Sequence, residues 1–217
     1  MLDEAVPQFE RASGGKVAMT IASSAAIMTS LKSGAAPDMV ILTREGVDEL
    51  VKQGRVVADT CADLASAGLG VAVKRGAPKP DISSTAALKR TLLDAKSVAY
   101  TANGASGLYF AQLLERLGIA EAMKPKSNIL KSGLAGDVVG RGESELGVQM
   151  ISEILAAPTA ELVGPLPPEV QSTMMFTAGT LSNSSRGAEA QALVKFLHTP
   201  AVGQVFKIKG LDPAAVK

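Results

Sequence analysis

The sequence predicts an α/β fold, because short apolar runs typical of buried strands alternate with helix-like segments along most of the chain. A Ser, Thr or Gly often stands between a strand and the next helix, and a Gly follows many of the helices, as helix capping requires. Hydrophobic residues make up 47% of the 217 residues and charged residues 20%. This composition supplies a buried core and excludes a disordered chain.

Apolar spacing and caps define the elements of the first part of the chain. Leu2, Val6 and Phe9 share one face of a first helix, which Gly14 and Gly15 end. The elements that follow are a strand over residues 16–21, a helix over 25–33, a strand over 38–42, a helix over 45–53 and a strand over 68–74.

The same alternation resumes after residue 80, and no repeat of fixed period accompanies it. The expected elements are a helix ending at residue 93, a strand over 97–100, a helix over 108–117, a strand over 128–130, a helix over 134–141, a strand over 145–150, a helix over 151–155, a strand-like segment over 161–164, an extended segment over 172–178, and helices over 188–197 and 201–207.

Two proline-rich segments divide the chain. Residues 75–80 hold two prolines and a glycine, and residues 165–168 hold three prolines. Two such crossings predict two lobes, one made of residues 1–77 plus 169–217 and the other of residues 78–168. Ligands bind preferentially in a cleft between lobes.

Charge and composition exclude several classes of function. The chain has 22 Lys and Arg against 21 Asp and Glu, which argues against a general binder of nucleic acid or membrane surfaces. With one Cys and one His, an intrachain disulfide and a Cys/His zinc site are both excluded. No signal-peptide pattern is visible, and the longest uncharged stretch, residues 97–114, is too polar to span a bilayer. We therefore expect no metal, no cofactor, no nucleic-acid partner and no membrane insertion.

Small hydroxyl or glycine residues follow the predicted strands where helices begin, at Ser23, Ser24, Thr43 and the turn over residues 104–107. Helix N-termini carry unpaired N–H groups and a partial positive charge, so several of them in one cleft predict an anion site. Ordinary capping explains each of them equally well when it is taken alone. Arg44 follows Thr43 at a helix start, where it is either exposed to solvent or a counter-charge to an anionic ligand.

Residues with catalytic chemistry are scarce. The turn over 104–107 is not a dinucleotide fingerprint, and no Walker A sequence occurs. Cys61 lies between Asp59 and Asp63, which disfavour a thiolate nucleophile. His198 ends a helix, where an interaction with the helix C-terminus is more common than catalysis. Glu153 is the acid nearest to Gln149, and its place on a helix predicts a solvent-facing side chain.

Taken in order, these segments resemble the periplasmic molybdate-binding protein family, the type II solute-binding proteins of ABC transporters. The resemblance rests on residues 9–14, 23–25, 34–41, 50–56, 107–109 and 145–148. It implies a two-lobed type II periplasmic-binding-protein fold in which each lobe is a mixed sheet flanked by helices. In this family the lobes close on a tetrahedral oxyanion held by hydroxyls and backbone amides. The resemblance also implies a periplasmic location and a membrane subunit of an ABC transporter as partner.

The resemblance maps ligand contacts onto Ser23, Ser24, Ala105 and Ser106. Members often have a tyrosine where this chain has Gln149-Met150, and an acidic residue where it has Arg44. Losing a hydroxyl donor and gaining a cation both indicate another anion, such as a carboxylate. The expected ligand-binding residues are Ser23, Ser24, Thr43, Arg44, Ala105, Ser106 and Gln149.

The leading prediction is therefore a solute-binding protein that takes up a small oxyanion or carboxylate and is not an enzyme. Residues 147–155 and 161–167 look more like a divergent branch of the family that includes aconitate isomerase. An isomerase of a small polycarboxylate is thus the alternative, although no residue stands out as its general base. The effector-binding domain of a transcription regulator is a second alternative.

The family also has a strand before the first helix, and the loop after that strand supplies a serine to the ligand. This sequence begins in the helix that follows. We therefore expect the sheet of the first lobe to lack its N-terminal strand, between residues 16–21 and 38–42. Both neighbours would then be without a shared partner, although buried backbone groups need pairing.

Overall fold

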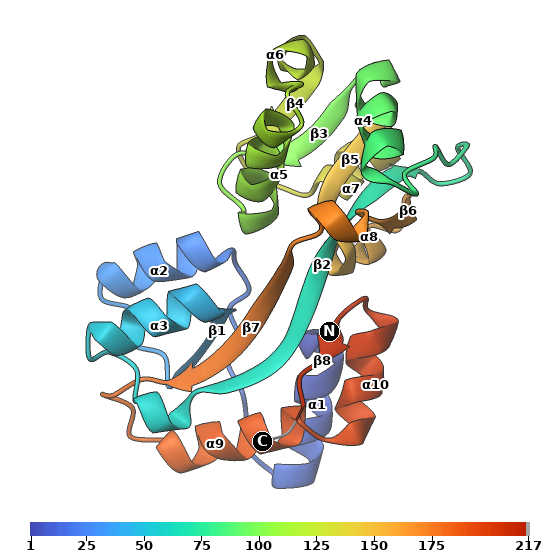
Figure 1. Ribbon diagram of the computed structural model, residues 1–217. Helices are drawn as coiled ribbons and strands as arrows, with labels where there is room; N and C mark the ends of the chain where they lie inside the picture. The colour runs from blue at the N-terminus through green and yellow to red at the C-terminus, as the bar shows by residue number, and fades with distance from the viewer. Residues whose placement is uncertain (216–217) are drawn as a thin grey trace. The chain divides into compact units, whose positions relative to one another are not determined.

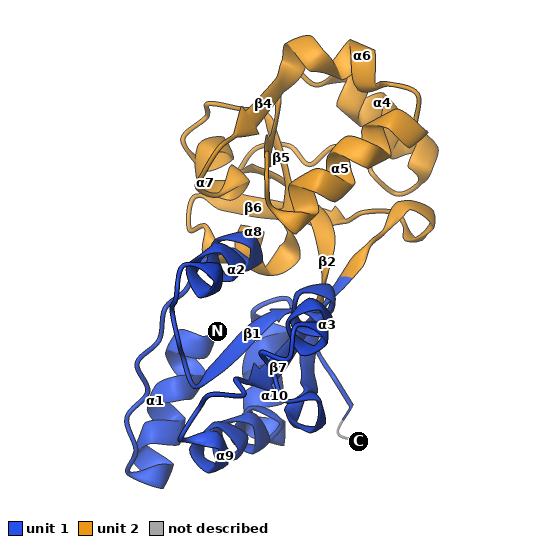
Figure 2. Ribbon diagram, turned by 90° about the vertical axis from the view of Figure 1, so that its left-hand side faces the viewer, with its two compact units in different colours: residues 1–66, 174–217 blue, residues 67–173 orange. Residues whose placement is uncertain are grey.

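The computed structural model describes residues 1–215 and contains two compact units (Figure 2). Unit 1 comprises Met1–Ser66 and Met174–Lys217, and unit 2 comprises Ala67–Thr173. Both boundaries lie at or inside strands, β2 (Ala62–Lys74) and β7 (Thr173–Thr180). The boundaries expected from the proline-rich segments, after residue 77 and before residue 169, differ from these because strands rather than loops carry the chain across.

Helices and short strands alternate in unit 1 (Figure 1). Its elements besides β2 and β7 are α1 (Leu2–Ser13), α2 (Ser24–Lys32), β1 (Met39–Thr43), α3 (Arg44–Lys52), the 3-10 turn Ala58–Thr60, α9 (Gly187–Leu197), α10 (Pro200–Ile208) and β8 (Asp212–Pro213). Gly14 ends α1 at φ 73°, a left-handed conformation that glycine adopts without strain.

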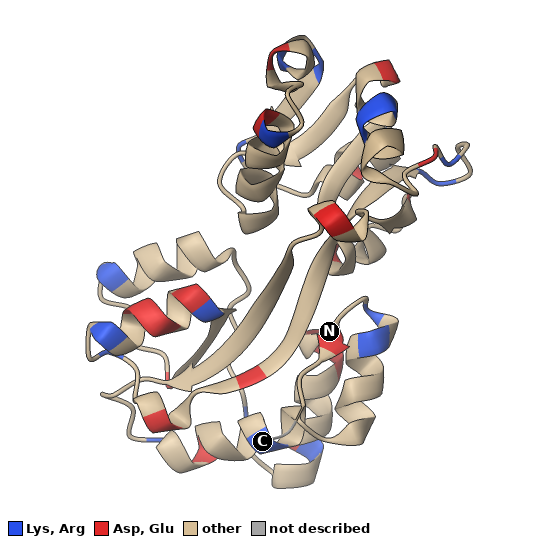
Figure 3. Cartoon of the chain, in the orientation of Figure 1, with Lys and Arg blue, Asp and Glu red and all other residues tan. Residues whose placement is uncertain are grey.

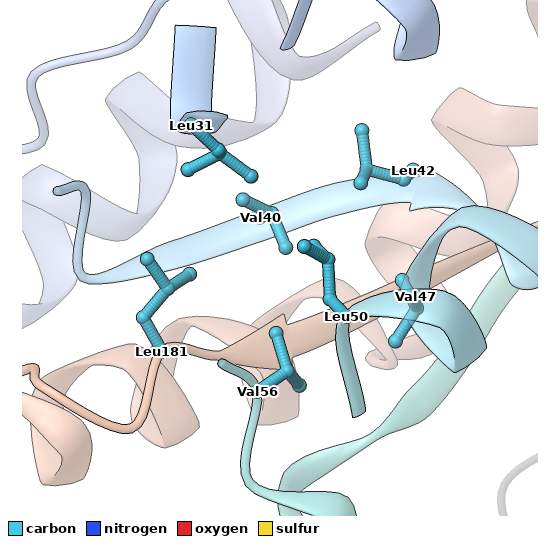
Figure 4. Packing of buried hydrophobic residues seen from close by; sticks show 7 residues of the cluster. All are labelled: Leu31, Val40, Leu42, Val47, Leu50, Val56 and Leu181. Atoms are coloured by element: carbon cyan, nitrogen blue, oxygen red, sulfur yellow. The ribbon is translucent and has the colours of Figure 1, made fainter. Parts of the chain in front are cut away.

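The sheet of unit 1 is antiparallel where β1 meets β7, with Met39 opposite Thr180 and Thr43 opposite Phe176. Next to β7 comes β2, whose first part pairs with β8. A cluster of aliphatic side chains from α2, β1, α3 and the following segments packs together, as Figure 4 shows. Its members are Leu31, Val40, Leu42, Val47, Leu50, Val56 and Leu181. Burial of these side chains fixes β1, and with it the start of α3.

Residues 16–21 do not form the strand that their sequence predicts. In the described part of the chain nothing pairs with them as a strand, and Met19 and Ile21 are 39% and 72% exposed. A cavity of about 590 Å³ is lined on one side by this segment and on another by Met39 and Ile41 of β1. An apolar run without a neighbouring strand forms no ladder.

Unit 2 contains the second half of β2 and a further set of alternating elements (Figure 1). They are α4 (Thr85–Asp94), β3 (Val98–Thr101), α5 (Ala105–Arg116), α6 (Ala120–Met123), the 3-10 turn Lys124–Lys126, β4 (Ser127–Leu130), α7 (Ala135–Gly140), β5 (Leu146–Met150), α8 (Ile151–Ala156), β6 (Ala160–Pro165) and the 3-10 turn Pro168–Val170.

The sheet of unit 2 is mixed. Strand β2 pairs antiparallel with both β5 and β6, whereas β3 pairs parallel with β5 on one side and with β4 on the other. The prediction of an α/β fold with sheets flanked by helices is confirmed, and parallel pairs join the antiparallel ones in unit 2. Charged residues lie mainly on helices and loops, and the strands are largely free of them (Figure 3). Among the described residues, the buried polar side chains are Ser106, Ser144, Gln149, Thr177 and Thr180.

A close backbone approach fixes where α5 begins. A Cβ atom added at Gly107 would lie 1.7 Å from the carbonyl oxygen of Thr101, so only glycine fits. We expect Gly107→Ala to lower the free energy of unfolding by at least about 2 kcal/mol, as followed by circular dichroism in urea. Gly203→Ala in α10 is the matched control. Its Cβ would be 3.6 Å from Pro213, and we expect a gain of up to about 1 kcal/mol. Equal stabilities of the two variants would contradict this account of the turn.

Candidate functional site

The carboxyl ends of the parallel strands of unit 2 meet at one edge of its sheet. Strands β3, β4 and β5 run in the same direction, and their last residues are Thr101, Leu130 and Met150. In open α/β sheets ligands bind at this edge, because the loops and helix starts that follow the strands gather there. Three of the predicted site residues, Ala105, Ser106 and Gln149, lie at this edge.

The turn between β3 and α5 supplies backbone donors. Gly104 is the N-cap of α5 and no side chain caps this helix, so the N–H groups of its first turn have no side-chain partner at the cap. Ser106 in that turn is 2% exposed. The hydroxyl oxygen of Thr101 is buried under the same turn and has no hydrogen-bond partner. An unpartnered buried hydroxyl beside free N–H groups is an arrangement that a polar ligand can satisfy.

Gln149 is held in a fixed orientation beside this turn. Its side chain is 1% exposed, and its Oε1 accepts a hydrogen bond from the backbone N–H of Gly136 at 3.3 Å. With Oε1 engaged, the amide NH₂ group is the part of Gln149 that can donate. Its position next to β3 follows from the parallel pairing of Ala99 with Gly147.

Glu153 does not face solvent as its place on a helix predicted. Met150 is the N-cap of α8 and Glu153 is the third helical residue, so its carboxylate folds back toward the cap, as in a capping box. Burial raises the pKa of Glu153, and hydrogen bonds with the Met150 backbone and the Gln149 side chain oppose the rise. Its Oε2 is buried and has no hydrogen-bond partner. The sequence contained a signal for this arrangement, because an acidic residue at the third position of a helix is typical of a capping box.

In unit 1 the structure brings Ser24 and Thr43 together, because the Ser24 hydroxyl oxygen accepts a hydrogen bond from the Thr43 N–H at 3.4 Å. Ser23 is the N-cap of α2, and its Oγ accepts from the Ala26 N–H at 3.3 Å. Both serines thus have structural hydrogen bonds. A serine that accepts from an N–H still has its own O–H to donate to a ligand.

Arg44 forms an ion pair with Asp63, which the sequence did not single out. The hydrogen bond from this pair raises the pKa of the Arg44 guanidinium. The other carboxylate oxygen of Asp63 accepts from the hydroxyl of Thr177 at 2.7 Å, and Thr177 is 1% exposed. The charge of Arg44 is therefore largely compensated within unit 1. Asp63 was missed because it lies 19 residues away from Arg44, and only the fold brings the two together.

His198 and Cys61 carry no catalytic arrangement. The two ring nitrogens of His198 lie 3.0 Å from the carbonyl oxygen of Val194 and 2.7 Å from that of Asp63, which ties α9 to β2. Burial, and next the charge of Asp48, raises the pKa of the Cys61 thiol, which disfavours a thiolate. Within residues 1–215, no three His, Cys, Asp or Glu side chains gather into a set that could hold a metal ion.

Comparison with known families and curated proteins gives a match over nearly the whole chain. The family model described as bacterial extracellular solute-binding protein matches residues 1–212. An aconitate isomerase from a Pseudomonas species is 34% identical over 216 residues, which cover 97% of this chain and 82% of that protein. No helix among the described residues has the length and apolar character needed to cross a bilayer.

Solved structures share the fold at lower identity. The periplasmic molybdate-binding protein of Azotobacter vinelandii aligns with a TM-score of 0.80 at 18% identity, covering 100% of this chain and 94% of that chain. A tungstate-binding protein of Desulfovibrio alaskensis aligns with a TM-score of 0.71 at 14% identity, covering 100% and 94%. These likenesses establish the two-lobed periplasmic-binding-protein fold predicted from the sequence.

The raised pKa of Glu153 predicts a pH-dependent stability difference. The folded protein holds this proton more tightly than the unfolded chain, so the wild type loses stability as the pH rises through the raised pKa. In Glu153→Gln this loss is absent. We therefore expect the stability of the variant relative to wild type to increase between pH 4 and pH 7.5, measured by urea unfolding.

Glu143→Gln is the control for this measurement. Glu143 is exposed, and its hydrogen bond with Arg141 lowers its pKa. The wild type therefore gains stability from Glu143 as the pH rises, and this variant changes in the opposite direction or not at all. A stability difference for Glu153→Gln that stays constant over the pH range would contradict the burial of its carboxyl group.

Proposed function

Because the chain belongs to the bacterial extracellular solute-binding protein family, we propose that it binds a small organic anion that carries several carboxylates. The observation that carries the proposal is the set of neutral donors at the carboxyl edge of unit 2: the N–H groups that start α5, the Ser106 hydroxyl and the Gln149 amide. A carboxylate is preferred over a metal oxyanion because the relative with 34% identity is an aconitate isomerase.

Neutral donors suffice for such a ligand. A helix start carries roughly half a positive charge, and preorganised N–H groups bind anions strongly where water is excluded. Arg44 adds little net charge because Asp63 compensates it. In unit 1, Ser23, Ser24 and Thr43 carry hydroxyl groups and stay predicted ligand contacts.

The proposal also covers the cellular location of the protein and its transport partner. We propose that the protein works in the periplasm and delivers its ligand to the membrane subunits of an ABC transporter. The family description and the periplasmic molybdate-binding relative in fold support this setting. Deletion of a neighbouring permease gene that abolished uptake of the ligand would support the partner, and unchanged uptake would contradict it.

Ligand binding predicts a stabilised fold. We expect citrate, trans-aconitate or tricarballylate at a hundred times its dissociation constant to add about 2.7 kcal/mol to the stability, measured as a thermal shift. Molybdate, tungstate and sulfate form the comparison panel. Gln149→Leu should reduce the stabilisation, and Thr173→Val at the exposed start of β7 should leave it unchanged. Stabilisation by molybdate or tungstate alone would contradict a carboxylate ligand.

A second candidate function is isomerisation of the bound polycarboxylate. It is favoured by the match to aconitate isomerase over 97% of the chain and by an acid, Glu153, at the edge that carries the donors. We expect the protein to interconvert cis- and trans-aconitate, followed by proton NMR of the vinyl signals. Aconitate that binds but keeps its isomer ratio from either direction would leave a carrier as the function.

A further inference from the structure

The carboxyl edge of unit 2 carries a buried acid, Glu153, that forms no ion pair with another described residue. Burial and hydrogen bonds, rather than a neighbouring charge, shift the pKa of Glu153 upward. Several other carboxylates of unit 2 are engaged with protein groups: Glu161 pairs with Lys79, Glu143 with Arg141, Glu121 with Lys124, and Glu145 accepts from the Lys96 N–H. Glu153 differs from these four in having a buried carboxylate oxygen without a hydrogen-bond partner.

The carboxylate of Glu153 is held by hydrogen bonds, while its Oε2 has no partner. It hydrogen-bonds with the Met150 backbone and with the side chain of Gln149, which is itself oriented by the Gly136 N–H. Its Oε2 is buried and without a partner, as is the hydroxyl of Thr101 at the end of the adjacent parallel strand. A carboxylate fixed through one part while its other oxygen is unpartnered is arranged for proton exchange with a bound molecule.

Three other titratable groups, Asp63, His198 and Tyr109, already have protein partners. In unit 1, Asp63 is bonded to Arg44 and Thr177, and both ring nitrogens of His198 lie against carbonyl oxygens. In unit 2, the hydroxyl of Tyr109 donates to the Val170 carbonyl at 2.9 Å and accepts from Arg116 at 2.7 Å. Hydroxyl and amide donors cannot take up a proton from carbon near neutral pH.

We infer that Glu153 is the proton-transfer group for an allylic isomerisation of a bound unsaturated tricarboxylate. This inference rests on the second candidate function, isomerisation. It concerns a residue that was expected from the sequence to face solvent, and the proposed step uses neither a metal nor a cofactor.

The step balances without any further reactant. The carboxylate of Glu153 removes a proton from the CH₂ group next to the terminal carboxylate of aconitate. The C–H electron pair forms the new double bond to the central carbon, and the old double bond shifts its electrons onto the former vinyl carbon. That carbon takes the proton back from Glu153, which ends as the carboxylate. The product is again aconitate, with its double bond in the other arm and in the cis or trans form.

The neutral donors have a defined part in this step. Negative charge spreads onto the substrate carboxylates while the proton resides on Glu153. Donors aimed at those oxygens stabilise the charge, and here they are the N–H groups that start α5 and the Gln149 amide. The same contacts that bind the anion therefore also favour removal of its proton.

The test compares Glu153→Gln with the wild type and with Glu143→Gln, an exposed acid of the same unit. The wild type should convert trans-aconitate into cis-aconitate, followed by proton NMR of the vinyl signals. Glu153→Gln should lose at least about a hundredfold in conversion rate, the usual size of a general-base contribution. Its dissociation constant for trans-aconitate, measured by calorimetry, should change less than about threefold. Glu143→Gln should convert at the wild-type rate.

A second variant distinguishes loss of the proton-transfer group from a folding defect. Glu153→Ala should be inactive and should regain activity when formate is added, because a small carboxylate can occupy the emptied space. Wild-type conversion by Glu153→Gln overturns the assignment of Glu153 and leaves the isomerase function standing. A wild type that binds aconitate without converting it overturns both the isomerase candidate and this inference, while carboxylate binding stands.

Discussion

Backbone pairing along β2 is the constraint on which both units depend. This strand pairs with β8 in unit 1, and in unit 2 it lies between β5 and β6. Leu69, Val71 and Ala72 are fully buried, so the N–H and C=O groups of this stretch need hydrogen-bond partners. Neighbouring strands supply partners for Val71 and Ala72, and the Gln171 side chain completes the set by accepting from the Leu69 N–H at 2.8 Å and donating to the Leu69 carbonyl at 3.0 Å. Gly70 stands opposite Gln149, and a Cβ at Gly70 would come within 2.9 Å of Ile151 and of the Gly164 carbonyl oxygen. The close approach at Gly70 thus sets where β5 ends and α8 begins.

Local signals in the sequence were sufficient for much of the fold. Helices with strong apolar periodicity and a cap, such as α1 with Gly14 and α4 with Ser84, formed close to the expected residues. The prediction of a strand over residues 16–21 was wrong. Its apolar composition is that of a strand, but a strand also needs a neighbour, and neighbours are chosen by the whole fold rather than by the segment. The length of β2 was underestimated because pairing with β8 extends it toward Ala62.

The residues of the candidate site also fall into two groups, those that a local sequence pattern predicts and those that only the fold brings together. Ala105, Ser106 and Gln149 could be found because a turn or strand end with small or polar residues is a local pattern. The pairing of Asp63 with Arg44 and Thr177 could not, since it depends on contacts between distant segments. The position of Glu153 at the third residue of a helix was a local signal, but that position alone does not determine how deeply the carboxyl group is buried. Arg44 shows the consequence. The sequence offered it as exposed or as a counter-charge. Its side chain is exposed, as the first alternative expected, and its ion pair with Asp63 adds a partner that only the fold could reveal.

A buried acid beside the proposed anion site would act on binding in two ways. In its protonated form Glu153 is a neutral donor that a carboxylate ligand can use, and in its ionised form it repels that ligand. Binding of an anion therefore favours the protonated form and makes the ionised form a stronger base. For a carrier the first effect alone is useful, because it tightens the complex. An isomerase needs both forms, since the proton must leave carbon for Glu153 and then return. A carrier on this fold would thus need only the protonated form of Glu153, whereas an isomerase would need the ionised form as well.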